Sequence, residues 1–236
     1  MRVAMAVAVA VMLALGPAGV SGASGQIAKH HERCDVCNSN GASEAVVFGA
    51  FDAVHRFRAR FEKGEAKSTD VQAVVTGLRI LFAHLDEVGV TKEMEQSILA
   101  REEELIRHVV TRAEAAAVAQ HHEKLGLQGT VDQEFQLMSG ATVNDRINLV
   151  KRLKNGGMKG LYASIIANFE ELQVRLAKAE KVGKPLSAAD FRACEDYHTV
   201  AAMFGVACAL GCAGCCVVSA MAELSYVLCE RTGGLF

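Results

Sequence analysis

The chain of 236 residues has a formal net charge of −2, no Trp and only three Tyr. A nearly neutral chain lacks the basic excess that holds a phosphate backbone, and few rings are present to stack on bases or sugars, so nucleic-acid and sugar binding are disfavoured. Only two Pro occur in the chain, which favours long helices.

Residues 1–23 have the pattern of an export signal. Arg2 is followed by an apolar run from Val3 to Leu15, and small residues near Ala23 suit cleavage after that position. The run is too short for a membrane span, and the alternative to a signal is a short buried first helix. The pattern predicts a protein that is secreted or exported to the cell envelope.

A C-x-x-C pair, Cys34 and Cys37, lies in residues 24–41, which are predicted to form an irregular arm. On a helix, His30 would share a face with both cysteines, and the three could bind Zn²⁺, although a structural zinc site needs a fourth ligand. A redox role needs a preceding strand, and none is predicted. A disulfide is the plainer interpretation in an exported chain, so these three residues are weak metal candidates and no cofactor is expected.

Residues 42–183 are predicted to form an all-α bundle of about six helices, because apolar residues recur at helical spacing without strand-like alternation. Thr130 with Gln133, and Thr142 with Asp145, form predicted capping boxes at two of the helix starts. The expected helices extend from about Ser43 to Gly64, Thr69 to Gly89, Thr91 to Lys124, Thr130 to Met138, Thr142 to Gly156, and Gly160 to Val182.

The histidines of this bundle form no catalytic motif. His55, His84 and His108 each stand alone, with no Ser or Cys partner that the sequence identifies. His121 and His122, near the end of the third predicted helix, are interpreted as helix-terminus cations or surface residues, with metal binding as the minor alternative. We therefore predict a non-enzymatic protein without catalytic residues.

The C-terminal segment 187–236 begins with a further predicted capping box, Ser187 with Asp190, after a boundary at Gly183. The 24 residues from Thr199 to Ala222 carry no charge and are long enough to span a bilayer, so a lipid membrane is a candidate partner for 199–222. The flanks lack the Lys and Arg anchors common at membrane spans. The sequence identifies no protein partner.

All eight cysteines are disulfide candidates, because their number is even and export is expected. On one continuous helix the last six would form a stripe of small apolar side chains, with the first and last of them about 50 Å apart at about 1.5 Å per residue. A hairpin that turns at Gly211–Gly214 would instead bring Cys194 and Cys229 within disulfide distance. Both arrangements stay open. The candidates are Cys34, Cys37, Cys194, Cys208, Cys212, Cys215, Cys216 and Cys229.

This Cys- and Gly-rich segment resembles the C-terminal part of halocin-like bacteriocin precursors. The residues that carry the resemblance are Cys194, the run from Val206 to Cys216, and Cys229. The resemblance implies an exported chain that releases an antimicrobial C-terminal peptide, together with an N-terminal part able to neutralise that peptide.

Three functional hypotheses follow from these features. The first is an exported non-enzymatic precursor whose C-terminal segment, closed by disulfides and cleaved near residues 183–187, acts on membranes. The second is an envelope protein anchored by a transmembrane helix at 199–222. The third is an exported zinc- or thiol-dependent protein that uses Cys34 and Cys37.

Overall fold

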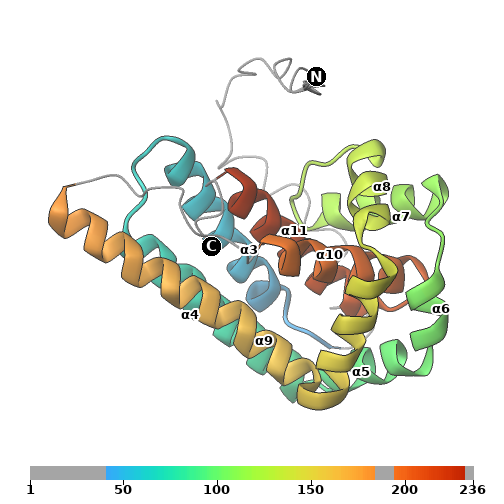
Figure 1. Ribbon diagram of the computed structural model, residues 1–236. Coiled ribbons are helices and arrows are strands. Elements are labelled where there is room, and N and C mark those ends of the chain that lie inside the picture. The colour runs from blue at the N-terminus through green and yellow to red at the C-terminus, as the bar shows by residue number, and fades with distance from the viewer. Residues whose placement is uncertain (1–40, 184–193, 232–236) are drawn as a thin grey trace, which may run out of the picture. The chain divides into compact units, whose positions relative to one another are not determined.

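The computed structural model describes residues 41–183 and 194–231, and all regular structure within these ranges is helical (Figure 1). The predicted all-α fold is therefore confirmed. The predicted signal, the C-x-x-C pair with His30, and the capping box at Ser187 lie outside the described residues. The helices are α3 (Glu44–Glu62), α4 (Ser68–Glu87), α5 (Val90–Ala100), α6 (Glu102–Arg107), α7 (Arg112–Lys124), α8 (Val131–Gly140), α9 (Val143–Val182), α10 (Cys194–Ala209) and α11 (Ala213–Arg231).

The helices α3, α4 and α9 pack through the apolar rows that the sequence predicts. α4 contacts both of the others, and it runs beside α9 in Figure 1. Leu78 of α4 and Phe169 of α9 are fully buried. Apolar residues three positions away on the same helices, Leu81 and Leu172, are fully buried as well. Amphipathic spacing therefore predicted correctly which faces of these helices point inward.

The predicted helix from Thr91 to Lys124 is wrong, because this segment forms the three helices α5, α6 and α7. The residue between α5 and α6, Arg101, has φ −117° and ψ 22°, and His108 after α6 is extended, with φ −61° and ψ 130°. Val109, an apolar residue in the middle of the predicted helix, is 82% exposed in the gap between α6 and α7. α7 begins as a separate helix at a capping box, in which the Thr111 hydroxyl accepts a hydrogen bond from the N–H of Glu114.

A buried arginine explains the gap between α6 and α7. The guanidinium of Arg146, from α9, donates to the carbonyl oxygen of Leu105 at 3.2 Å and to that of His108 at 2.8 Å. In a continuous helix these oxygens would accept backbone N–H groups four residues further along. The same guanidinium donates to the carbonyl of Met138 at 3.2 Å, so Arg146 joins α6 and α8 to α9.

The predicted fifth and sixth helices are the two parts of α9, which is kinked at Gly157. This residue has φ 63° and ψ −175°, a conformation essentially restricted to glycine. The N–H of the next residue, Met158, donates to the Glu95 carboxylate of α5 at 3.0 Å. Beyond the kink, Tyr162 stacks on Phe82 of α4, with ring centroids 4.0 Å apart.

The helices α10 and α11 form a hairpin, which is one of the two arrangements left open by the sequence. The chain turns over residues 210–212, where Gly211 has φ 97°. The N–H groups of Gly211 and Cys212 donate to the carbonyls of Cys208 at 2.9 Å and Ala207 at 3.0 Å, which ends α10. A single helix across 199–222 is therefore excluded, and α11 begins at Ala213, within the predicted turn region Gly211–Gly214.

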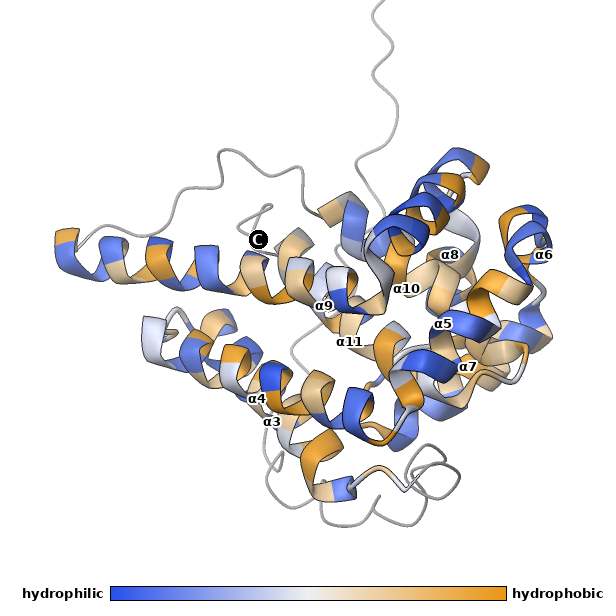
Figure 2. Ribbon diagram, turned by 90° about the horizontal axis from the view of Figure 1, so that it is seen from below, coloured by the Kyte–Doolittle hydropathy of each residue, from blue (hydrophilic) through white to orange (hydrophobic). Residues whose placement is uncertain are grey.

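The hairpin lies among the helices that precede it (Figures 1 and 2) and belongs to the same compact unit. α10 contacts α6, α7, α8 and α9, whereas α11 contacts α3, α5 and α7. Residues 200–208 and 214–222 are buried without exception. A helix that is apolar on all sides is stable in water only when other helices enclose it, and here the earlier helices do so.

Candidate functional site

Three disulfides close the α10–α11 hairpin. Cys194–Cys229 joins the two ends of the hairpin, with Cα atoms 5.5 Å apart. Near the turn, Cys208–Cys216 and Cys212–Cys215 have Cα separations of 4.8 Å and 5.3 Å. The six cysteines that would line one side of a continuous helix are therefore paired across and within the turn.

Small residues let the two helices of the hairpin approach closely. A Cβ added at Gly205 would lie 3.2 Å from both Ser219 Oγ and a side-chain carbon of Met138 in α8. The Ser219 hydroxyl donates to the carbonyl of Ala201 at 2.8 Å, so this buried hydroxyl is satisfied within the hairpin. The hairpin therefore satisfies its own polar groups at this crossing.

The turn end of the hairpin is held by α5 and by the residue after it. A Cβ added at Gly214 would lie only 2.7 Å from Val90 and 2.8 Å from Met94, so α11 and α5 touch at a position that requires glycine. Arg101 donates to the carbonyl of Leu210 in the turn at 2.8 Å. These contacts bind the hairpin to the N-terminal part of the bundle.

A buried polar cluster also connects the hairpin with the bundle. His122 of α7 lies with its Nδ1 atom 2.8 Å from Glu134 Oε1 of α8 and 2.8 Å from Glu223 Oε2 of α11. The side chains of His122 and Glu134 are each 1% exposed. The surface location that the sequence analysis offered for His122 is therefore wrong, because the residue faces inward onto two carboxylates, although it does lie in the last turn of α7.

Burial and hydrogen bonding compete in this cluster. Burial alone would lower the pKa of His122, but the nearby carboxylates of Glu134 and Glu223 raise that pKa to about 9. Burial raises the pKa of Glu134, and the nearby Glu223 adds to the increase while His122 opposes it. Glu223 is also the first charged residue after the uncharged stretch from Thr199 to Ala222.

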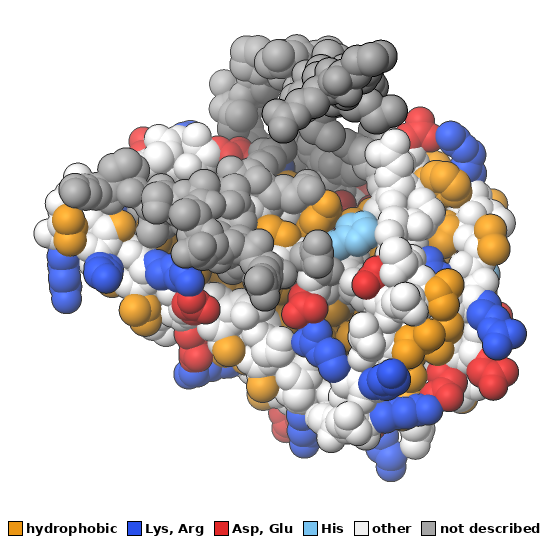
Figure 3. Space-filling model, in the orientation of Figure 1, with side chains coloured by type: hydrophobic (Ala, Val, Ile, Leu, Met, Phe, Trp, Pro, Cys, Tyr) orange, Lys and Arg blue, Asp and Glu red, His pale blue; other side chains and the backbone are white. Residues whose placement is uncertain are grey.

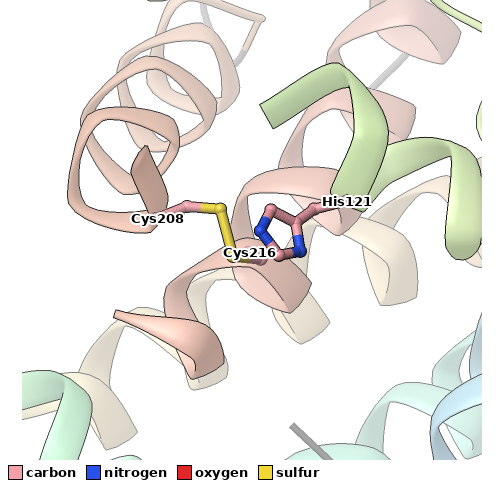
Figure 4. Close-up of side chains that lie close together, drawn as sticks. All are labelled: His121, Cys208 and Cys216. Carbon is pink, nitrogen blue, oxygen red and sulfur yellow. A yellow bond between two sulfur atoms is a disulfide. The ribbon is translucent and has the colours of Figure 1, made fainter. Parts of the chain in front are cut away.

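The neighbouring His121 lies against the Cys208–Cys216 disulfide (Figure 4). One of its ring nitrogens and the two sulfur atoms all lie within 4.8 Å of one another. Because the sulfurs are bonded to each other, neither is a thiolate that could bind a metal ion. In this oxidised state the imidazole of His121 covers the disulfide.

The other histidines of the bundle have individual surroundings. His84 Nε2 accepts the N–H of Ser43 at 2.8 Å, and His108 Nε2 lies 2.8 Å from Glu114 Oε1. His55 Nε2 is a buried atom without a hydrogen-bond partner among the described residues. The structure therefore brings none of these three into the cluster around His122.

The surface of the bundle contrasts with its interior. Figure 3 shows basic and acidic side chains interspersed over one face, with apolar side chains between them. None of the helices in the described ranges combines the length and apolarity required to cross a bilayer.

Comparison of the chain with protein-family models, with curated proteins and with solved structures finds no match. Sequence reasoning missed the cluster at His122, because its members lie on three helices. The one signal available was Glu223, a lone carboxylate at the end of an uncharged stretch.

Proposed function

We propose that this chain is an exported, non-enzymatic precursor in which the α10–α11 hairpin is the membrane-active unit and helices α3–α9 keep it away from lipid. The observation that carries the proposal is the enclosure of an uncharged, disulfide-closed hairpin. Residues 200–208 and 214–222 are all buried, although they would be free to enter lipid if uncovered.

A helical hairpin is suited to entering a membrane because its backbone groups are already hydrogen-bonded within the helices. The 16 residues of α10 correspond to about 24 Å at about 1.5 Å per residue, less than the hydrocarbon thickness of about 30 Å. The hairpin would therefore enter part of the bilayer as a pair of helices. The disulfides would hold both helices together during insertion.

The covering helices would act as an inhibitor within the same chain. The hairpin is held by non-covalent contacts with α5 to α9 and α3 as well as by the chain preceding Cys194. A cut near residues 183–187 would therefore leave the hairpin in place. Release would require the cover to open, and this predicts that cleavage and membrane activity are separate steps.

Dye release from lipid vesicles tests the proposal. A recognition sequence for a specific protease is placed between Gly183 and Ser187, the oxidised chain is cut, and the 187–236 fragment is purified under denaturing conditions. We expect the free fragment to release dye from anionic vesicles, whereas the intact chain and the cut but undissociated chain do not.

The matched control is the same fragment carrying Val217→Asp, which places a charge at a position that is 2% exposed in the chain. This fragment should lose most of its vesicle activity while keeping its disulfides, which mass spectrometry verifies. Equal dye release by the intact chain and the free fragment would contradict the covering role. No release by the fragment would contradict the membrane activity.

The hypothesis of a transmembrane anchor at 199–222 requires a different structure of the C-terminal segment. A single membrane-crossing helix would require the turn at residues 210–212 to straighten and the Cys194–Cys229 bridge to open. No observation favours that rearrangement. The hypothesis that uses Cys34 and Cys37 remains a prediction about residues outside the described ranges.

A further inference from the structure

The cluster of His122, Glu134 and Glu223 has the composition and spacing of a metal site. Three helices, α7, α8 and α11, each contribute one side chain, and the three candidate ligand atoms all lie within 4.8 Å of one another. Ligand atoms about 2.0–2.2 Å from a tetrahedral zinc ion lie about 3.4 Å apart. The observed separations of 2.8 Å from Nδ1 to each carboxylate would need to open only slightly.

Unsatisfied atoms in the cluster give a second, independent observation. Glu134 Oε2 is buried without a hydrogen-bond partner among the described residues, and its side chain is 1% exposed. Glu223 Oε2 also lacks a hydrogen bond of good geometry, although it is 2.8 Å from His122 Nδ1. Buried carboxylate oxygens are normally satisfied, so these lone pairs are available for a cation.

Charge and ligand type indicate the class of cation. A divalent ion would displace the proton of His122, and the two carboxylates with a neutral imidazole would then carry two negative charges, which the ion would neutralise. An imidazole nitrogen with carboxylate oxygens suits zinc, whereas Ca²⁺ prefers six to eight oxygen ligands and Mg²⁺ usually keeps several waters. Three protein ligands leave a fourth position for a water molecule.

We propose that His122, Glu134 and Glu223 bind one divalent transition-metal ion of the zinc type, which fastens the hairpin to α7 and α8. The site differs from the weak candidate His30–Cys34–Cys37, and from the group at His121, where the sulfurs form a disulfide. The proposal goes beyond the proposed function, because a metal site could be present whether or not the hairpin acts on membranes.

Metal binding to the intact chain tests the proposal. Cys34→Ser and Cys37→Ser are introduced together, so that the C-x-x-C pair cannot bind the ion, and a thiol assay verifies that the other cysteines are oxidised. The chain is stripped with a chelator and titrated with Zn²⁺ by calorimetry. We expect one ion per chain, a higher unfolding temperature with Zn²⁺ present, and visible Co²⁺ bands without thiolate charge transfer.

The variants Glu134→Gln and Glu223→Gln keep the side-chain size and should each weaken Zn²⁺ binding at least tenfold. Glu114→Gln is the matched control, because it alters a carboxylate of α7 that is paired with a different histidine, His108, and it should leave Zn²⁺ affinity unchanged. Circular dichroism and disulfide mapping check that each variant is folded.

Two results would overturn the proposal. One is the absence of stoichiometric Zn²⁺ binding by the folded chain. In that case protons alone would neutralise the negative charge of the two carboxylates. The other is binding that survives both glutamine substitutions, which would place the ion elsewhere. Neither result bears on dye release by the hairpin, so the proposed function is tested separately.

Discussion

Arg146 shows how one side chain can determine where a helix ends. It is a charged residue that is only 4% exposed, and its guanidinium donates to three backbone carbonyls. Because those carbonyls belong to Leu105, His108 and Met138, the loss of this side chain would leave several buried acceptors unsatisfied. Its planar group with five donors suits this role better than a lysine would.

We expect Arg146→Met to lower the free energy of unfolding by about 3–5 kcal/mol, since breaking hydrogen bonds to a buried charged group has costs of this order. Urea unfolding measured by circular dichroism gives the value. Arg152→Met is the matched control on the same helix, because Arg152 makes an exposed ion pair with Asp196, and its loss should change stability by less than about 1 kcal/mol. Similar losses in the two variants would contradict the role given to Arg146.

His55 predicts a pH dependence of stability. Burial lowers the pKa of His55, the charge of Arg58 lowers it further, and Asp52 opposes the shift. The unfolded chain therefore binds a proton near pH 6.5 while the folded chain does not, so stability falls as the pH drops through 6.5 toward the folded pKa.

The variant His55→Leu removes this titrating group, and its urea midpoint should fall less than that of the unchanged chain between pH 8 and pH 5. The comparison isolates His55 because the other seven histidines are the same in both proteins. Identical pH profiles for the two proteins would show that His55 titrates alike in the folded and unfolded states.

The role of a residue could be predicted from the sequence where its partners lie only a few positions away along the chain. The capping boxes at Thr130 and Thr142 involve residues three positions apart, and the structure has both. His122 acquires its buried partners from α8 and α11, and no spacing within the sequence of α7 indicates them. Contacts between distant segments are set by packing, which a single sequence does not display.

At the scale of elements, α9 depends on the conformation of Gly157. Its φ of 63° with ψ of −175° is strained for any residue with a side chain, and an added Cβ would lie 2.9 Å from Glu95 Oε2. Gly156, directly before it, has open space around an added Cβ. The two adjacent glycines therefore form a matched pair for mutation.

Gly157→Ala should lower the free energy of unfolding by about 1–3 kcal/mol, whereas Gly156→Ala should leave it unchanged or raise it by up to about 1 kcal/mol. Thermal and urea unfolding of both variants measure the difference. Equal changes in the free energy of unfolding at the two positions would contradict this prediction. They would show that α9 can straighten at Gly157 without loss of stability.

The break between α6 and α7 shows why element boundaries were harder to predict than element types. No Gly or Pro interrupts the sequence from Thr91 to Lys124, and its apolar spacing continues across the gap. The local signal was the Thr111–Glu114 capping box inside that run. Helical periodicity alone therefore did not indicate the boundary between α6 and α7, which depends on Arg146.

At the scale of the whole molecule, the hairpin supplies the interior of the bundle. Burying a Val, Met or Phe side chain contributes about 1.5–3 kcal/mol to stability. Seven such residues together therefore contribute an amount comparable to the whole net stability of a typical domain, which is about 5–15 kcal/mol. Those at most 2% exposed in the two buried stretches are Val200, Met203, Phe204, Val206, Val217, Val218 and Met221. The earlier helices should therefore not fold alone.

A chain that ends at Gly183 should lose its cooperative urea transition and bind a hydrophobic dye, because its apolar faces have nothing to cover. The full chain cut between Gly183 and Ser187 is the control, and it should retain its near-ultraviolet dichroism, since the hairpin stays in place. A cooperative transition of the shortened chain at the midpoint of the full chain would contradict this dependence. The sequence indicated the apolar segment but not its position inside the bundle.

The bridge between Cys194 and Cys229 also makes the hairpin a macrocycle, closed by backbone on one side and by sulfur on the other. An exopeptidase that trims inward from either end of a freed segment would meet a branched residue at the bridge instead of a further linear peptide. Chains first cut at different positions before Cys194 would then be trimmed to the same disulfide-closed hairpin. The identity of the final product would be fixed by this covalent ring, whatever the exact specificity of the protease that opened the chain.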